Sequence, residues 1–248
     1  MNPAEFAHIA RAEEQLWWYR GQRRILYRLL DPIARERQFQ RVLEAGCGTG
    51  YQSKDLTERY GWPMTPLDLG WLGLEYARGF GLERLTQGDV GALPYRDRAF
   101  DAVLSLDVIV HFHRGDDHRA FAEIARVLAP GGLCVIRVSA LDILRSRHSM
   151  HAHEHQRFTA SRLRASMQQA GLRVDRLTYC NSLLLPIALF KFRVWEPLTN
   201  APPASGVDPV PGWLDSLLHL PLVLESSLIG AGLDLPLGQS LLAIATRE

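Results

Sequence analysis

Short apolar runs alternate with amphipathic stretches of helical period from residue 41 onward. The runs that read as strands are 42–45, a run ending at 67, 82–87, 100–106, 133–138, 173–180 and 240–246. Helical period begins near residues 52 and 71 and covers 116–128 and 161–170, and Gly171 closes the last of these helices. This alternation predicts an α/β fold, with a parallel sheet covered by helices on both faces.

The segments that flank this pattern are also apolar. Residues 1–40 carry apolar side chains at helical spacing, and Pro32 is expected to end the second helix there. Residues 181–238 hold two apolar stretches, 183–192 and 213–229, on either side of a Pro- and Gly-rich loop at 197–212. We expect an N-terminal helical lid (1–40), a core (41–180), an apolar helical insert that packs as a cap or as a homodimer surface (181–238), and a final core strand (239–248).

Composition narrows the classes of partner. The chain of 248 residues has a formal net charge of +1 and no long basic block, so we expect small molecules rather than nucleic acid. No apolar run approaches the roughly 20 residues needed to span a bilayer, although the insert leaves peripheral membrane contact as an alternative. Cys47, Cys134 and Cys180 stand far apart, and the charged N-terminus resembles no secretion signal. A cytoplasmic location is expected.

The stretch VLEAGCGTG (42–50) joins a strand to a loop with glycine at every second position: Gly46, Gly48 and Gly50. Such a loop lets backbone approach a ligand closely and can aim free N–H groups at an anionic end. It departs from the dinucleotide fingerprint, which needs a small residue where Tyr51 stands. An NAD-dependent oxidoreductase is therefore disfavoured.

Two carboxylates end the next two expected strands. Asp68 follows Gly46 by 22 positions and can accept hydrogen bonds from ribose hydroxyls, or can cap the following helix. Pro63 and Pro66 indicate that its strand is short or bulged. Asp89 can take the amino hydrogens of an adenine while the N–H of Val90 meets a ring nitrogen.

In order and spacing, residues 42–50, Asp68, 88–94, 100–112 and 123–139 resemble the methyltransferase type 11 subgroup of class I S-adenosylmethionine-dependent methyltransferases. The resemblance implies a Rossmann-like, seven-stranded doubly wound sheet in the order 3-2-1-4-5-7-6, with the last strand antiparallel. It implies S-adenosyl-L-methionine as cofactor, with Glu44 and Gly46 at the methionine end, Asp68 at the ribose and Asp89 at the adenine. The full set of expected cofactor residues is Glu44, Ala45, Gly46, Gly48, Gly50, Asp68, Leu69, Asp89, Val90 and Leu106.

Candidate bases follow the fourth strand at Asp107, His111 and His113. The resemblance extends to His111, a histidine common in the subgroup, for which helix capping is the alternative role. His113 stands outside that pattern on a loop expected to border the acceptor, so we favour it as general base.

Aromatic and histidine-rich segments are the candidate acceptor-binding groups. Trp17, Trp18 and Tyr19 are adjacent, so one helix face cannot bury all three. The flanks 17–24 and 155–159 resemble a bacterial branch of the family with an aromatic lid. The run from His148 to His155, with Glu154, raises a zinc or iron site as an alternative to a polar loop that carries His153 and His155 over the acceptor. We expect the polar loop and no metal.

The expected activity is methyl transfer by in-line displacement to a small acceptor with hydrophobic surface, at oxygen rather than nitrogen. Proximity in a dry site supplies most of the acceleration, so a missing base would not exclude the reaction. The alternatives are a cyclase or scaffold that binds the same cofactor without transferring methyl, and a module that sits on a membrane surface.

Overall fold

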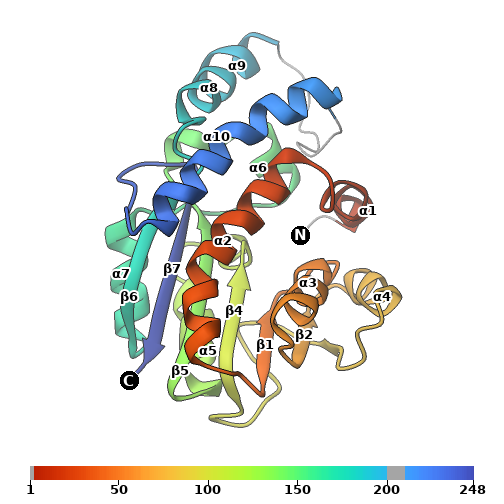
Figure 1. The fold of residues 1–248 in the computed structure, drawn as a ribbon, viewed down its shortest axis with the longest axis vertical. Helices are drawn as coiled ribbons and strands as arrows, with labels where there is room; N and C mark the ends of the chain where they lie inside the picture. Colours follow the sequence, from red (N-terminus) through yellow and green to blue (C-terminus); the bar gives the residue numbers. More distant parts are fainter. Residues whose placement is uncertain (1–2, 200–209) are drawn as a thin grey trace.

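The computed structural model describes residues 3–199 and 210–248 (Figure 1). Seven strands form one sheet in the order β3-β2-β1-β4-β5-β7-β6, and only β7 runs antiparallel to its neighbours. This confirms the sheet order and the antiparallel last strand that the family resemblance implies. The strands are β1 (Val42–Ala45), β2 (Met64–Asp68), β3 (Thr86–Gln87), β4 (Phe100–Leu106), β5 (Leu128–Ser139), β6 (Leu172–Cys180) and β7 (Ser240–Arg247).

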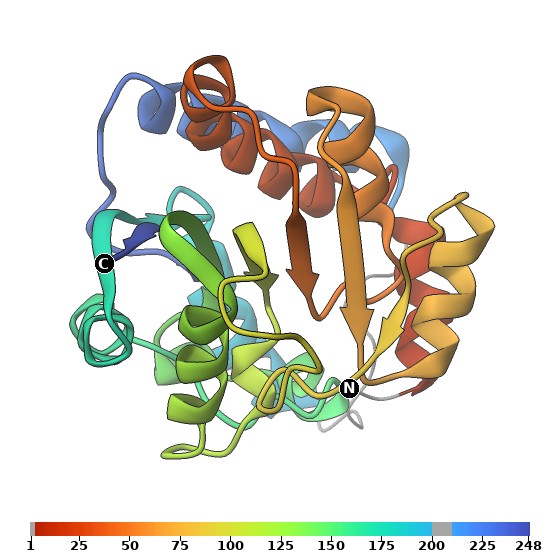
Figure 2. The ribbon, with the colours of Figure 1, turned by 90° about the horizontal axis from the view of Figure 1, so that it is seen from below.

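Helices cover both faces of the sheet (Figure 2). One face packs against α2 (Trp17–Glu36), α3 (Tyr51–Tyr60) and α10 (Gly212–Gly230), and the other against α5 (Asp117–Val127) and α7 (Ala160–Gln169). At the β3 edge, α1 (Pro3–Ala12) packs on α4 (Trp71–Gly79). The carboxyl ends of β1, β2, β3 and β4 lead into the loops that carry the candidate residues.

The prediction that Pro32 ends the second helix is wrong, because α2 continues through it to Glu36. Proline removes one backbone donor from a helix, and here the cost is offset by burial on the opposite side. Pro32 is exposed, whereas Leu29, Leu30 and Ala34 are buried around it in the core under the sheet. Most of α2 is therefore a layer of the sheet core.

Two strands, β3 and β5, differ from the sequence pattern by more than one residue. β3 has two residues, and it pairs only with Leu67 and Asp68 of β2. Pro66 consequently lies within β2 but before the stretch where β3 runs alongside it. β5 begins five residues earlier than predicted, because Leu128 already pairs with Phe100 before an irregularity leads to Leu133.

The insert between β6 and β7 is helical. A run of α8 (Leu185–Phe190), a π-helical turn (Lys191–Trp195) and α9 (Glu196–Thr199) precedes α10, which packs along α2. The middle of the predicted loop, 200–209, lies outside the described residues. Buried Glu225 of α10 accepts backbone hydrogen bonds from Asn181, Ser182 and Leu183, which ties α10 to the start of this run. Short helical segments at Ile109–His111, Asp142–Leu144 and Arg147–His151 (α6) complete the described structure.

Candidate active site

Three glycines shape the loop after β1. Gly46, Gly48 and Gly50 have φ angles of 89°, 56° and 80°, which side chains rarely adopt. A Cβ on Gly46 would lie 2.2 Å from Cγ2 of Val108, and one on Gly50 would lie 2.5 Å from Cβ of Ala77. A Cβ on Gly48 would meet nothing within 4 Å. The loop therefore packs tightly at its two ends and is open at its middle.

Most of the amides of this loop are already bonded within the protein. Gly46 and Cys47 both donate to the carbonyl of Leu67 at 2.8 Å, Gly50 donates to Cys47 at 2.9 Å, and Gly48 donates to Oδ2 of Asp68 at 2.8 Å. From the sequence, these N–H groups are expected to be free for the anionic end of a ligand. That expectation is wrong for these four N–H groups, because the loop closes against the end of β2. What it offers a ligand is close backbone approach rather than a cradle for an anion.

Asp68 and Asp89 end β2 and follow β3, as the sequence predicts. Asp68 also accepts from the N–H of Gly70 at 2.7 Å, and its carbonyl accepts from Gly88 at 3.0 Å. Asp89 accepts from the N–H of Gly91 at 2.8 Å. Burial raises the pKa of Asp68, against the lowering effect of its backbone donors. These bonds fix the two carboxylates on adjoining loops.

Glu44 in β1 is a buried carboxyl beside the glycine loop. It accepts a short hydrogen bond from the hydroxyl of Ser53 at the start of α3, and burial raises its pKa to about 8. The glutamate is therefore poised to lose or hold a proton near neutral pH, and a nearby cation would favour its ionised form.

Glu13 lies against the glycine loop, and the sequence reasoning did not select it as a candidate. It follows α1, is 6% exposed, and accepts a 2.5 Å hydrogen bond from the hydroxyl of Thr49 in the glycine loop. Burial raises its pKa to about 7, and its Oε1 has no partner among the described residues. In the sequence it stands among charged residues that are typical of a solvated helix, so no local signal marks it.

The remaining expected cofactor residues differ in exposure. Ala45 and Val90 are buried, Leu106 is half-buried, and Leu69 is 68% exposed beside Asp68. A buried hydrogen bond from the hydroxyl of Ser105 to the carbonyl of Ala45 joins β4 to β1 at this end of the sheet. Ala45 and Leu106 therefore lie in β1 and β4, whereas Leu69 and Val90 lie in the loops after β2 and β3.

The structure brings Asp107 next to the aromatic segment. Asp107 has a φ of 61° and forms an ion pair with Arg137 of β5 at 2.7 Å. The guanidinium of Arg137 lies 5.8 Å from the ring of Trp18, which packs edge-on against Tyr19 at 4.9 Å. Trp17 instead turns toward the core clusters. The aromatic pair of Trp18 and Tyr19 therefore reaches the ends of β4 and β5.

Two of the candidate histidines lie together. The rings of His113 and His155 are 4.1 Å apart between centroids, and burial followed by the neighbouring His113 lowers the pKa of His155. His111 has its Nδ1 3.0 Å from the carbonyl of His153, and burial lowers its pKa. The geometry gives His111 a link to the histidine-rich loop and leaves His113 and His155 as an exposed pair.

The histidine-rich run does not form a metal-binding cluster in the part of the chain that the structure describes. Glu154 is buried and pairs with Arg157 at 3.1 Å. His148 and His151 also have interaction partners. The run therefore begins as the short helix α6 and continues as a loop in which Arg157 neutralises the carboxylate of Glu154, so the expected polar loop is helical in its first half.

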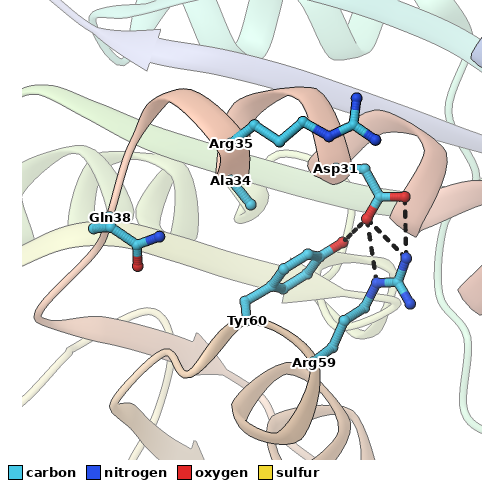
Figure 3. A pocket seen from close by; sticks show the side chains of 6 residues that line it. All are labelled: Asp31, Ala34, Arg35, Gln38, Arg59 and Tyr60. Carbon is cyan, nitrogen blue, oxygen red and sulfur yellow. Dashed lines mark hydrogen bonds and ion pairs between the residues drawn. The ribbon is translucent and has the colours of Figure 1, made fainter.

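A separate hollow of about 460 Å³ lies between α2 and α3 (Figure 3). Its lining residues are Asp31, Ala34, Arg35, Gln38, Arg59 and Tyr60. The carboxylate of Asp31 is already bonded to Arg59 and, at 2.7 Å, to the hydroxyl of Tyr60. Because α3 starts at the glycine loop and ends at Tyr60, this hollow lies at the amino ends of the strands, whereas open α/β sheets bind ligands at the carboxyl ends. It is separate from the candidate site.

Comparison with known proteins supports one family. Residues 43–136 match the family model described as a methyltransferase domain. The chain is 38% identical to a probable tRNA methyltransferase 9B of Mus musculus over 104 residues, covering 41% of this chain and 22% of that protein. It is 32% identical to a malonyl-[acyl-carrier protein] O-methyltransferase of Geobacter sulfurreducens over 170 residues, covering 61% of this chain and 63% of that protein.

The fold has wider matches. A putative methyltransferase solved in complex with the Trm112 activator of Haloferax volcanii superimposes with a TM-score of 0.59 at 19% identity, covering 98% of this chain and 93% of the other. The chain spans about a fifth of the length of the first curated relatives. The matched sequence is thus concentrated in the strands and loops that form the candidate site.

Proposed function

Because this chain carries a class I S-adenosylmethionine-dependent methyltransferase domain, we propose that it transfers a methyl group from S-adenosyl-L-methionine to an oxygen of a small acceptor. The cofactor supplies an activated methyl group on a cationic sulfonium. The chain's own residues bind the two substrates, exclude water and hold the acceptor in line. The observation that carries the proposal is the ring of carboxyl groups around the glycine loop.

The acidic groups at that loop favour binding of a cationic cofactor and disfavour binding of a pyrophosphate. Glu13 and Glu44 are both buried beside the loop with raised pKa values, and Asp68 bonds to it directly. A cation stabilises the ionised form of each carboxyl, whereas a second anion would add to the cost of their burial. The loop N–H groups also argue against a pyrophosphate, because most of them are bonded within the protein and few remain to donate to phosphate oxygens.

The residues fit the parts of S-adenosylmethionine. Glu44, Glu13 and the backbone around Gly46 would hold the methionine end, where the unpartnered Oε1 of Glu13 offers an acceptor for an ammonium group. Asp68 would bind the ribose, and Asp89 with Val90 the adenine. Burial of Glu13 within hydrogen-bond distance of Thr49 supports its inclusion.

The acceptor would lie between the aromatic pair and the histidines. Trp18 and Tyr19 would exclude water over the ends of β4 and β5, and His113 would take the proton of a hydroxyl group as it is methylated. Alignment of donor and acceptor contributes up to about 7 to 11 kcal/mol, whereas a general base contributes about 10² to 10⁴ in rate. The similarity to an O-methyltransferase over 170 residues supports oxygen as the acceptor atom.

A two-stage experiment tests the proposal. Calorimetry with the purified chain should detect binding of S-adenosylmethionine, and incubation with hydroxyl, carboxyl, amine and RNA acceptors should release S-adenosylhomocysteine with a hydroxyl or carboxyl compound. If calorimetry detects no heat of binding for S-adenosylmethionine, the cofactor assignment is wrong. Binding without transfer to any acceptor would favour the cyclase or scaffold alternative.

A further inference from the structure

The insert exposes two apolar stripes. On α8, the π-helical turn and α9, the exposed residues Ile187, Phe190, Val194 and Leu198 recur every three or four positions. On α10, Trp213, Leu217, Leu220 and Leu224 do the same, and Trp213 is 71% exposed. A helix normally turns such a stripe toward a core, so exposed stripes on adjacent helical segments mark a surface that contacts something else.

The fully exposed charges on these helices are positive, although their acidic residues outnumber their basic ones. Lys191 and Arg193 are exposed next to the first stripe. The acidic residues of the insert helices are already engaged: Glu196 accepts from the backbone of Arg147 at 2.9 Å, Asp215 pairs with Arg20, and Glu225 is buried on backbone amides. The surface therefore combines apolar side chains with cations and lacks an uncompensated carboxylate among the described residues.

We propose that this face, defined as the exposed side chains of α8–α9 and of α10 from Trp213 to Leu224, docks on an anionic lipid surface. Helices with an apolar stripe, exposed Trp and Phe, and lysine or arginine beside the stripe lie in the interface of bilayers that contain anionic lipids. Trp195 and Trp213 supply the aromatic groups. A second copy of the chain is a poorer fit, since a symmetric contact would bring Lys191 and Arg193 of both copies to one interface, where like charges repel.

The docking face is bonded to both sides of the candidate acceptor site. Arg147 of α6, at the start of the histidine-rich loop, holds α9 through Glu196. The N–H of Trp17 and the guanidinium of Arg20, on either side of the aromatic pair, both bond to Asp215 of α10. Figure 1 shows α8 and α9 at one end of the molecule near α6, with α10 running from that end along α2. If the proposed function holds, docking places the acceptor site beside the lipid, which suits an acceptor with a hydrocarbon tail.

Vesicle sedimentation tests the proposal without cofactor or acceptor, so a failure of the methyltransferase assignment leaves the result readable. The purified chain should sediment with phosphatidylcholine vesicles that contain phosphatidylglycerol, and far less with phosphatidylcholine alone. The charge-reversed double variant Lys191→Glu/Arg193→Glu should lose binding by roughly 30-fold or more, since each basic residue near an anionic surface contributes about 1 kcal/mol.

A second pair of variants separates apolar docking from bulk charge. Phe190→Glu/Trp213→Glu should abolish sedimentation, whereas Trp71→Glu, which replaces an exposed tryptophan on α4 outside the docking face, should lose no more than about fivefold, the effect of one added charge at about 1 kcal/mol. Thermal melts by circular dichroism should show all variants folded. Absence of sedimentation in the wild type, or full retention in Phe190→Glu/Trp213→Glu, overturns the proposal. So does a dimer by analytical ultracentrifugation that only this double variant dissociates, because the face would then join two copies of the chain.

Discussion

The carboxylate of Glu13 accepts a hydrogen bond from the hydroxyl of Thr49, which joins the connection between α1 and α2 to the glycine loop. The N-terminal helices are thereby tied to the same loop that Asp68 holds from the opposite side. Arg23 of α2 also bonds to the backbone carbonyl of Glu13, so the connection is held at both its side chain and its main chain. A change at Glu13 is therefore expected to affect both stability and cofactor affinity.

Stability should fall as pH rises. The pKa of Glu13 is raised from 4.5 to about 7 and that of Glu44 from 4.5 to about 8, so the folded state holds more protons than the unfolded state within this range. The contribution of the two protonated carboxyls to the free energy of unfolding is complete below pH 4.5, and it is lost as the pH rises through their pKa values in the folded state. We expect the free energy of unfolding without cofactor, from urea titrations, to decline between about pH 4.5 and 8.

Glu13→Gln isolates one of these two groups. The variant should remove the share of Glu13 in the decline between pH 4.5 and 7, up to about 3 kcal/mol at 1.36 kcal/mol per pH unit, and should leave the share of Glu44, which extends to about pH 8. It should also weaken binding of S-adenosylmethionine most at pH 8, where the wild-type carboxyl is ionised. Identical slopes for the variant and the wild type would contradict the assignment.

Asp68→Asn should reduce affinity for S-adenosylmethionine by about tenfold or more. Asparagine lacks the charge and can accept fewer of the bonds from Gly48 and Gly70, and hydrogen bonds to charged groups contribute about 1.5–3 kcal/mol. Asp101→Asn is the matched control, because Asp101 pairs with Arg41 at the amino end of β4. Equal affinities of the two variants in calorimetry would remove Asp68 from the cofactor site.

Three glycine-to-alanine variants separate backbone strain from ligand approach. Gly48 and Gly81 both have positive φ and open space at the Cβ position, so each should lose about 1–2 kcal/mol of stability. Only Gly48→Ala should also weaken cofactor binding, because Gly81 lies outside the loop. Gly46→Ala should lower the melting temperature most, since its Cβ also collides with Val108. A smaller loss for Gly46→Ala than for Gly81→Ala would refute this order.

His113→Ala should lower kcat/KM about 100-fold with a hydroxyl acceptor and leave cofactor affinity unchanged, if His113 is the base. His118→Ala is the control, an exposed histidine on α5 that bonds to the carbonyl of Gly115. His118→Ala should keep the wild-type kcat/KM. An undiminished kcat/KM in His113→Ala would assign the proton transfer elsewhere, with the adjacent His155 the first candidate.

The sheet was predictable from residues because its signals are local. Apolar runs ended by Gly46, Asp68 and Asp89 marked the carboxyl ends of β1, β2 and β3, and the family resemblance supplied the strand order. The errors were tertiary in origin. The helix through Pro32 persists because of neighbours on the sheet, and three of the four loop amides donate to Leu67 or Asp68, partners 20 or more positions away.

The candidate site was predictable only in part for the same reason. Glu13 becomes significant through Thr49, 36 positions later, and nothing in its own segment distinguishes it from Glu14. The pairing of His113 with His155 likewise depends on a loop that folds back, which His155 achieves by donating its N–H to Val110. Such contacts require the folded chain.

The position of β7 between β5 and β6 sets an order of events during synthesis. The whole insert, including both apolar stripes, is synthesised before β7. Because β7 lies between β5 and β6, this half of the sheet can close only after the insert has left the ribosome. Until β7 is synthesised, the facing edges of β5 and β6 stay unpaired while the apolar helices of the insert are already exposed. Unpaired strand edges and exposed apolar surface together favour aggregation. Production of this protein should therefore benefit from slow translation at low temperature and from chaperones that shield nascent chains.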